Sequence, residues 1–210
     1  MEIRELAVEG ALEFTPSAYP DERGLFVAPF QGPALAQARD QDTFPVRQAN
    51  QSRSRRGALR GIHYTRTPPG VAKYVSCAHG SALDIVVDLR VGSPTYGRWE
   101  CVEMNQESFR SVYFPVGVGH AFIALEDDTV MSYMLTGGYV PEDELAVSAL
   151  DPRLALPIPD GLEMILSPRD RDAISLEDAA RQGLLPEYDR CVQLDAELRR
   201  QGDGEDLKSA

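Results

Sequence analysis

Three histidines, His63, His79 and His120, are the side chains of this 210-residue chain best suited to accept a proton near neutral pH. His79 stands beside Gly80 at the end of a predicted strand, where we expect a structural or solvated role. His63 lies among cationic residues, and His120 lies where a Pro-Val-Gly-Val-Gly loop meets the next strand. His63 and His120 are therefore retained as candidate site residues.

A metal centre is the first alternative for a small β protein that contains histidines. Such a site needs a close His-x-His pair and a carboxylate nearby, whereas His63 and His79 are sixteen residues apart with no acid between them. Arg60, Arg66 and Lys73 would also repel a divalent cation. The sequence therefore predicts no metal site.

Other catalytic templates are missing from the sequence. No Walker-type or Rossmann-type glycine loop follows a predicted strand, and no Gly-x-Ser-x-Gly motif occurs. The remaining His, Tyr, Lys and Arg side chains suit proton transfer beside a developing oxyanion. Tyr133 is one candidate for this chemistry, but its position in the predicted strand is equally compatible with simple packing in the core.

The distribution of charge gives a second signal. Acids outnumber bases 33 to 21, and a net charge of −12 argues against a nucleic-acid binder. Between Asp42 and Asp84, however, there is no carboxylate, and this acid-free window holds seven cations: Arg47, Arg53, Arg55, Arg56, Arg60, Arg66 and Lys73. Two interpretations stay open, a solvated basic face or a positive site for a small anion such as a phosphorylated metabolite.

The elements that must position these residues are short β segments separated by turn residues. Residues 72–79 and 82–89 flank Gly80-Ser81 and are typical of a hairpin. Roughly eight strands at a spacing of about 10–12 residues predict a mainly β sandwich or barrel. The segment 130–135 is apolar at nearly every position, so we expect both of its faces to be covered.

The strand that contains His63 poses a geometric problem. Alternation places Arg60 and Ile62 on one face and Gly61 and His63 on the other. Arg60 and His63 can serve one pocket only if the strand bulges near Gly61, where no side chain is present.

Helices are predicted at residues 33–40, from Ser175 to about Gln182, and from about Tyr188 to Arg200; Ser175 and Asp178 fit a capping box. Residues 1–200 are interpreted as one domain with a small helical C-terminal appendage, and residues 201–210 as a frayed polar tail.

The charged N-terminus and the lack of a long apolar run predict neither secretion nor membrane insertion. Three scattered cysteines are interpreted as reduced thiols of a cytoplasmic protein.

The run Leu59-Arg60-Gly61-Ile62-His63-Tyr64 resembles the signature of the dTDP-4-dehydrorhamnose 3,5-epimerase family. Lys73, Tyr133 and the segments 84–90, 92–97, 115–122, 151–152 and 167–170 continue the resemblance in order, from residue 21 to about residue 185. The segments 68–70 and 126–129 are most similar to epimerases of actinomycete antibiotic deoxysugars.

The resemblance implies a cupin-like jelly roll that works as a homodimer without metal or cofactor and acts on a dTDP-4-keto-6-deoxyhexose. It implies that His63 is the base, that Asp170 orients it, that Tyr133 is the acid on the opposite face of the sugar, and that Lys73 stabilises the enolate oxygen. It also implies a set of residues that hold the nucleotide-sugar: Arg23, Phe26, Gln48, Asn50, Arg60, His120, Tyr139, Glu144 and Arg169. Arg23 and Phe26 would reach into the site of the partner subunit.

The chain departs from the family pattern at Ala28, at Gly137-Gly138, which replaces an acid or amide followed by tyrosine, and at Arg169 in place of lysine. These departures leave open whether C3, C5 or both centres are inverted. Two other functions also stay open, a 3,4-ketoisomerase of dTDP-4-keto sugars and a non-catalytic nucleotide-sugar binding module. The carbonyl position of the product would distinguish the first, and proton exchange would distinguish the second.

Overall fold

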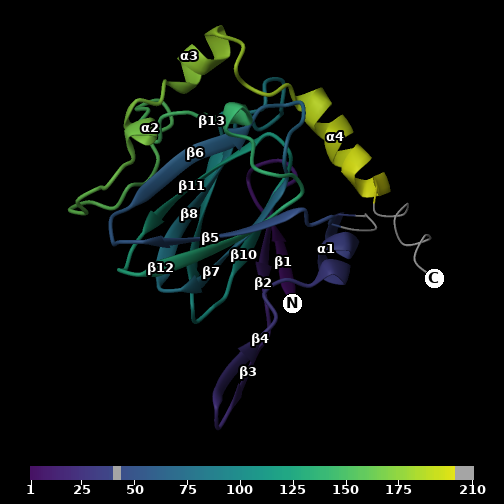
Figure 1. Ribbon diagram of the computed structural model, residues 1–210, viewed down its shortest axis with the longest axis vertical. Coiled ribbons are helices and arrows are strands. Elements are labelled where there is room, and N and C mark those ends of the chain that lie inside the picture. The colour runs from purple at the N-terminus through teal and green to yellow at the C-terminus, as the bar shows by residue number, and fades with distance from the viewer. Residues whose placement is uncertain (40–43, 202–210) are drawn as a thin grey trace.

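The computed structural model describes residues 1–39 and 44–201 as two antiparallel β-sheets that face each other, with short helices around them (Figure 1). The larger sheet contains, in spatial order, β1 (Glu2–Glu5), β2 (Leu12–Thr15), β10 (Ser111–Phe114), β7 (Lys73–His79), β12 (Thr129–Leu135) and β5 (Gln48–Ser54). The smaller sheet contains β13 (Glu144–Ala146), β6 (Leu59–Thr65), β11 (Val118–Ala124), β8 (Ser81–Asp88) and β9 (Trp99–Asn105). The predicted mainly β, jelly-roll sandwich is confirmed.

The helices lie outside the sandwich. They are α1 (Gly32–Arg39), α2 (Pro168–Arg171), α3 (Leu176–Arg181) and α4 (Tyr188–Gln201), with a 3₁₀ turn at Pro141–Asp143. The three predicted helices are confirmed, and the Ser175 side chain accepts a hydrogen bond from the amide of Asp178 as a capping residue should. Asp40, the predicted last residue of α1, and nearly all of the predicted tail lie outside the described residues.

Alternating side chains divide the apolar residues into three layers. Residues that face inward from both sheets, such as Val86, Phe122 and Met131, form the layer between the sheets. The outer side of the smaller sheet is covered by C-terminal residues such as Leu154. On the outer side of the larger sheet, Leu35 of α1 belongs to the cluster that covers the β2, β10 and β7 end. At the β12 and β5 end of this outer face, Met134 packs against the same cluster but is only partly buried.

Strand β12 is consequently less buried than its sequence predicts. Met131 and Leu135 are buried on the inner side, but Val130, Ser132 and Met134 are only half-buried on the outer side. Ser132 and Met134 line an outer hollow of about 710 Å³. The expectation that both faces are covered is wrong for the chain taken alone.

The predicted bulge in β6 is confirmed. On the neighbouring strand His120 pairs with His63 but Phe122 pairs with Arg60, so the register shifts between the two pairs. Gly61 has a φ of 116°, and a Cβ there would lie 2.4 Å from the carbonyl oxygen of His120. Only glycine fits this position, and the bulge turns Arg60 and His63 to the same side of the sheet.

Strand β11 begins earlier than predicted. Val118 and Gly119 belong to β11, whereas the sequence indicated a loop over residues 115–119. A Cβ on Gly119 would lie 2.6 Å from the Ile62 side chain. Glycine is needed here because β6 packs closely against β11, although a glycine at this place in the sequence indicates a loop.

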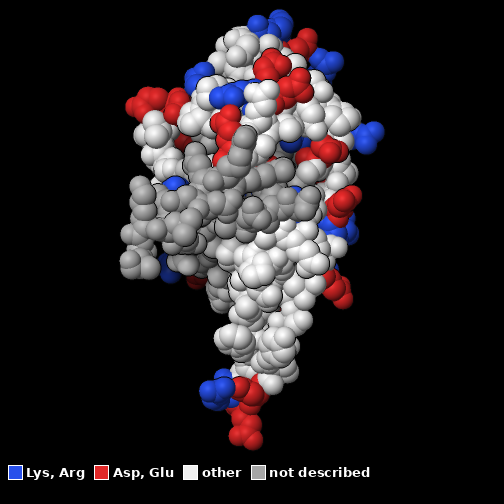
Figure 2. Space-filling view, turned by 90° about the vertical axis from the view of Figure 1, so that its right-hand side faces the viewer, with Lys and Arg blue, Asp and Glu red and all other residues white. Residues whose placement is uncertain are grey.

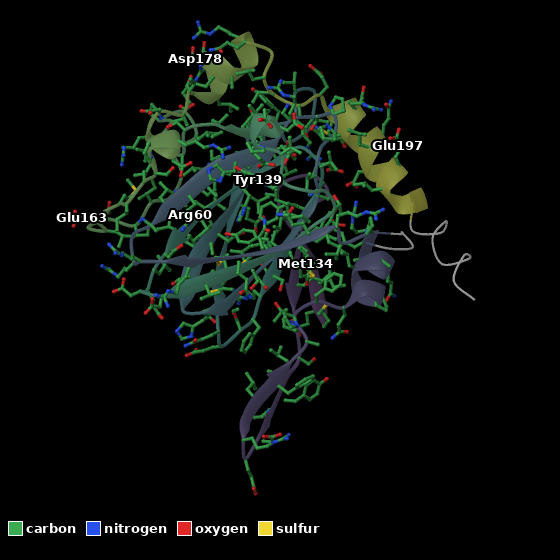
Figure 3. The ribbon with its side chains drawn as sticks, viewed as in Figure 1. Arg60, Met134, Tyr139, Glu163, Asp178 and Glu197 are labelled. Carbon is green, nitrogen blue, oxygen red and sulfur yellow. The ribbon has the colours of Figure 1, made fainter. Side chains whose placement is uncertain are left out.

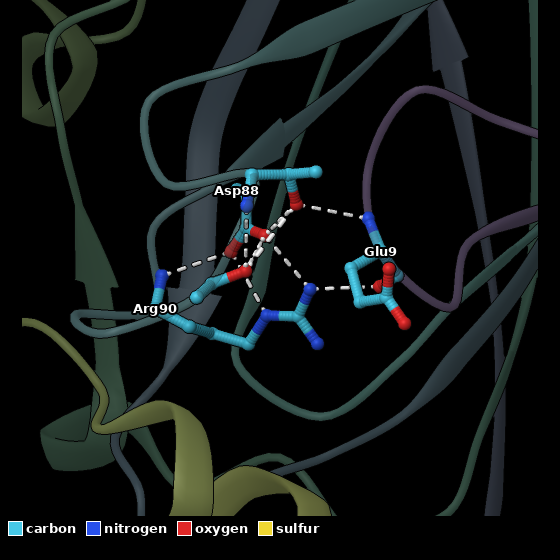
Figure 4. Close-up of polar contacts among 5 residues, drawn as sticks. Glu9, Asp88 and Arg90 are labelled. Atoms are coloured by element: carbon cyan, nitrogen blue, oxygen red, sulfur yellow. Dashed lines mark hydrogen bonds and ion pairs between the residues drawn. The ribbon is translucent and has the colours of Figure 1, made fainter.

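The motif around Asp88 proves to be structural. Asp88 and Arg90 form a buried ion pair with an Nη2–Oδ2 distance of 2.8 Å, and Ser93 donates to the same carboxylate oxygen (Figure 4). Arg90 also donates to the carbonyl oxygen of Glu9, and Thr95 Oγ1 accepts from the Glu9 amide. These contacts fix the N-terminal segment to the turn after β8.

A hairpin formed by β3 (Ala18–Asp21) and β4 (Gly24–Val27) projects from the body of the molecule, as Figure 1 shows. Its apolar side chains are exposed, with Tyr19 at 61% and Phe26 at 67%. In the view of Figure 2 its charged atoms gather at the tip, and the stretch between tip and body is uncharged. This hairpin contains Arg23 and Phe26.

Candidate active site

A cavity of about 560 Å³ lies between the two sheets and gathers most of the predicted site residues. The larger sheet contributes Asn50, Ser52, Lys73 and Tyr133, and the smaller sheet contributes Arg60, His63, Thr65, His120, Phe122 and Glu144. Tyr139 and Arg169 complete the wall from loops and α2. Side chains from both sheets therefore meet across one space.

His63 is held by a buried carboxylate. Its Nε2 atom lies 2.6 Å from Oδ1 of Asp170, whose side chain is only 2% exposed. Asp170 lies in the first turn of α2, and Ser167 both caps this helix and donates to the second oxygen of the carboxylate at 2.9 Å. Hydrogen bonding to Nε2 places the proton there and leaves Nδ1 with its lone pair free.

The electrostatics of this pair suit a base at neutral pH. Burial lowers the pKa of His63, and Asp170 opposes that effect, while Arg169 and Lys73 lower the pKa further. Burial alone would raise the pKa of Asp170, but hydrogen bonds from His63 and Ser167 outweigh it and hold the pKa below its ordinary value. The resting pair is therefore a neutral imidazole beside an ionised carboxylate.

Lys73 brings a cation to the cavity. It starts β7 and is 8% exposed, so its ammonium group is largely desolvated. Burial lowers its pKa, and the nearby Glu144 carboxylate raises it in opposition. A desolvated ammonium interacts strongly with negative charge that develops beside it.

Tyr133 of β12 lines the same cavity as Lys73. The strand pairs it with Asn50 of β5 on one side and with Val75 of β7 on the other. Its phenol oxygen lies 3.2 Å from the hydroxyl of Ser52. Burial raises the pKa of Tyr133 to about 12, and the Ser52 contact acts in the opposite direction. Tyr133 is therefore protonated at neutral pH and able to donate.

His120 forms a second imidazole–carboxylate pair. Its Nε2 atom lies 2.5 Å from Asp84 Oδ1, and its ring packs 4.5 Å from Phe114, centroid to centroid. Asp84 is fully buried, burial raises its pKa, and its second oxygen has no hydrogen-bond partner among the described residues. This pair packs beside Tyr133, with ring centroids of His120 and Tyr133 5.9 Å apart.

The predicted binding residues separate into two groups. Asn50, Arg60, His120, Tyr139, Glu144 and Arg169 line the cavity, and Figure 3 labels Arg60 and Tyr139. Gln48 supports that wall, because its amide donates to Asn50 Oδ1 at 2.7 Å and its oxygen accepts from the Tyr139 amide. Arg23 and Phe26 lie apart on the hairpin, where Arg23 pairs with Asp21.

Sequence reasoning missed Ser52, Thr65 and Asp84. Ser52 could have been predicted, because it follows Gln48 and Asn50 at a spacing of two residues and its side chain therefore lies on the same face of β5. Thr65 follows His63 in the same way and donates to Glu144 at 2.9 Å. Asp84 had no signal of this kind, since a carboxylate within an apolar strand gives no sign of its partner.

Over residues 1–39 and 44–201 there is no group of three or more His, Cys, Asp or Glu side chains placed to hold a metal ion. In the same part of the chain, every helix is too short or too polar to cross a membrane.

The site can move protons on two sides of a bound molecule. An imidazole with a carboxylate behind it projects from one sheet, a phenol projects from the other, and an ammonium lies in the same cavity. Such an arrangement can remove a proton from one face of a carbon next to a carbonyl and deliver a proton to the opposite face.

Comparison with known proteins agrees with this chemistry. The model of the dTDP-4-dehydrorhamnose 3,5-epimerase family matches residues 5–178. A dTDP-4-dehydrorhamnose 3,5-epimerase of Streptomyces griseus is 43% identical over 202 residues, which cover 96% of this chain and 100% of the relative.

Two solved structures are similar over nearly their whole length. One is a double mutant of ChmJ, a 3′-monoepimerase from Streptomyces bikiniensis, in complex with dTDP; it has a TM-score of 0.89 and 44% identity, covering 94% of this chain and 98% of that one. The other is NovW, a 4-keto-6-deoxy sugar epimerase from the novobiocin biosynthetic gene cluster of Streptomyces spheroides, with a TM-score of 0.88 and 46% identity over 91% and 95% of the two chains.

Proposed function

The chain belongs to the dTDP-4-dehydrorhamnose 3,5-epimerase family, and from this premise we propose that it epimerises a dTDP-4-keto-6-deoxyhexose at C3, at C5 or at both centres. It is a carbohydrate epimerase that needs no cofactor. The likeness to NovW favours a place in the biosynthesis of an antibiotic deoxysugar.

One observation carries the assignment of roles. His63 and Tyr133 project into one cavity from opposite sheets, and each has the protonation state that its role requires. Inversion of a centre needs a base on one face of the ring and an acid on the other. A non-catalytic binding module would have no use for a buried imidazole–carboxylate pair opposite a phenol.

The first step is removal of a proton from C3 or C5, each of which is α to the C4 ketone. Nδ1 of His63 takes the proton, the electron pair of the C–H bond forms a double bond to C4, and the π electrons of the C4 carbonyl move to its oxygen to give the enolate. Asp170 stabilises the resulting imidazolium, as the carboxylate of a catalytic triad does. The Lys73 ammonium stabilises the enolate oxygen, an effect worth about 3 kcal/mol by comparison with single oxyanion donors.

The second step is protonation of the enolate carbon from the other face. Tyr133 donates its phenolic proton, the ketone re-forms, and the centre is inverted; the His63 imidazolium then loses its proton to water and the Tyr133 phenolate takes one from water. In the ChmJ double mutant the substitutions replace a histidine by asparagine and a tyrosine by phenylalanine, at the same sequence separation as His63 and Tyr133. That correspondence supports the choice of these two residues.

The cavity cations provide for the anionic part of the substrate. Arg60 and Arg169 line the same space as His63, and guanidinium groups match the geometry of phosphate oxygens. The dTDP in the ChmJ complex supports a thymidine diphosphate carrier for this chain as well. Asn50, His120, Tyr139 and Glu144 then contact the sugar and its carrier, with Gln48 behind them.

The hairpin supports a homodimer with a shared site. Exposed Phe26 offers an aromatic face on which thymine can stack, and Arg23 offers a charge for the diphosphate, but neither lines the cavity of its own chain. The half-exposed outer side of β12 gives a second copy an apolar surface on which to pack. We place this dimer in the cytoplasm, with residues 1–200 as its domain.

Shared sites can be tested by complementation. Arg23→Ala and His63→Asn variants should each be nearly inactive as homodimers. Refolded together, they should recover activity, because a mixed dimer contains one site with an intact His63 and an intact Arg23 from its partner. Absence of recovery in mixtures shown to contain mixed dimers would refute sharing.

The reaction itself is tested by incubation with dTDP-4-keto-6-deoxyglucose in heavy water, followed by mass spectrometry and NMR. We expect deuterium at C3, at C5 or at both, with the carbonyl still at C4, and no exchange in His63→Asn. A carbonyl moved to C3 would identify a ketoisomerase, and binding of dTDP without any exchange would refute the enzymatic proposal.

A further inference from the structure

The hydroxyl of Ser52 is the only side-chain partner recorded for the phenol of Tyr133 within residues 1–39 and 44–201. The two oxygens are 3.2 Å apart, and each residue lines the cavity. Ser52 lies in β5 and Tyr133 in the neighbouring β12, two positions off direct register, since Tyr133 pairs with Asn50. A diagonal contact of this kind holds the phenol toward one end of the cavity.

The surroundings of the phenol make this contact important. Burial raises the pKa of Tyr133 to about 12, and the buried carboxylate of Asp84 adds to the rise. Ser52 and Arg60 act in the opposite direction. When the phenol donates its proton it becomes a phenolate, which then needs a hydrogen-bond donor, and the serine hydroxyl can turn to supply one.

We infer that Ser52 is a positioning residue that directs Tyr133 and stabilises its phenolate, and that it thereby sets how often the enolate is protonated on the second face. This inference rests on the proposed function. An enolate formed by His63 has two fates, return of a proton from His63 on the first face or donation by Tyr133 on the second. If Tyr133 becomes a weaker acid, return of the proton from His63 to the first face becomes more frequent than inversion.

The neighbouring residues of β5 show the same pattern. Gln48 holds Asn50 at 2.7 Å, and the Ser54 hydroxyl accepts from Arg60 Nε at 3.2 Å. The inward face of this edge strand thus contacts one cavity residue after another. Ser52 is the member of the row that contacts a proton donor.

The test compares Ser52→Ala with two other variants. Ser52→Thr keeps a hydroxyl at the same position and should retain the ratio of the unaltered protein. Ser148→Ala is the control, because its half-buried hydroxyl accepts from the Leu150 amide at 3.3 Å and lines neither the cavity nor the outer hollow of β12. Each protein is incubated with dTDP-4-keto-6-deoxyglucose in heavy water.

Two quantities are measured in each reaction, deuterium at C3 and C5 of the recovered substrate and the amount of inverted product. In Ser52→Ala we expect the ratio of exchange to inversion to rise on the order of tenfold, the magnitude of one hydrogen bond to a charged group. KM and the rate of exchange should remain close to those of the unaltered protein.

Three results would overturn the inference: equal loss of exchange and inversion, an unchanged ratio, or the same change in Ser148→Ala. These are distinct from failure of the proposed function. If the unaltered protein exchanges no proton, or if exchange persists in His63→Asn, the roles proposed above fail whatever Ser52 does.

Discussion

Replacement of Asp170 by asparagine tests how the carboxylate behind His63 acts. The substitution keeps the size of the side chain but removes a negative charge 2.6 Å from the imidazole, at a position only 2% exposed. The charge matters most when His63 has taken a proton, because an imidazolium in a desolvated cavity then has a buried counter-ion. The amide can also donate to Nε2 and so favour the wrong tautomer.

The expected cost can be estimated from the burial of the pair. Breaking a buried ion pair by removing one partner costs about 3–5 kcal/mol, and a hydrogen bond to a charged group contributes about 1.5–3 kcal/mol. The two ranges meet at about 3 kcal/mol, which corresponds to roughly a hundredfold slower proton abstraction. Solvent deuterium exchange at C3 or C5, followed by mass spectrometry, measures this step directly.

The pH profile separates loss of charge from damage to the fold. Asp170 raises the pKa of His63, so the variant imidazole should have a still lower pKa. The acid limb of kcat/KM, where protonation of the base stops the reaction, should therefore move to lower pH although the maximum rate falls. Asp172→Asn, on an exposed residue at the end of α2, is the control. Exchange within threefold of the unaltered protein, or an acid limb at higher pH, would refute the assigned role.

Three further changes test other parts of the structure. Tyr133→Phe should keep solvent exchange at the first site but lose net inversion, measured by NMR of substrate and product; inversion at the ordinary rate would show that another group is the acid. Lys73→Met should slow exchange and inversion equally, by about 10²–10³-fold, with equal or greater stability to urea because a buried ammonium is removed. Arg90→Met should cost about 3–5 kcal/mol in urea unfolding at pH 7, because it leaves the Asp88 carboxylate buried without its cation. Burial alone would raise the pKa of Asp88, but its hydrogen-bond partners lower the pKa below its ordinary value. The stability that this ion pair gives the unaltered protein is therefore present above the ordinary carboxyl pKa and is lost as the pH falls through the lowered pKa.

The bulge at Gly61 could be predicted because two independent requirements conflicted. A shared site requires the side chains of Arg60 and His63 to lie in one pocket, whereas alternation in a regular strand places them on opposite faces. The residue between them that lacks a side chain is where an irregularity is tolerated, and the register shift opposite His120 and Phe122 is located there. Such a conflict is informative because it specifies a position as well as an element.

Strand β5 could not be predicted in the same way. Its sequence, Gln-Ala-Asn-Gln-Ser-Arg-Ser, contains no β-branched or aromatic residue and resembles a loop. It is extended because all seven of its residues pair with β12. Its polar residues are explained by what they face, since the inward positions contact the site and the outward positions are exposed. Tertiary pairing and the needs of the cavity override local propensity here.

Proline is depleted in strands, yet Pro20 lies within β3. A proline lacks the N–H that a central strand would need, but β3 pairs with β4 alone in a two-stranded sheet and has a free edge. A proline in a short strand is therefore evidence for an edge, which is where a segment that reaches toward a partner would lie.

The acid-free window shows how a charge pattern divides between the two interpretations that the sequence left open. Arg53 and Arg66 pair at the surface with Asp128 and Asp143, carboxylates from outside the window, and this part is the solvated face. Arg60 and Lys73 instead line the cavity, where Arg169 from α2 joins them. A carboxylate on the inner faces of β6 or β7 would lie beside these cations and neutralise them. The carboxylates that approach the cavity come from other elements: Asp170 contacts His63, Asp84 contacts His120, and Glu144 accepts from Thr65 and lies near Lys73. The cations Arg60, Lys73 and Arg169 can therefore serve an anionic substrate and an enolate.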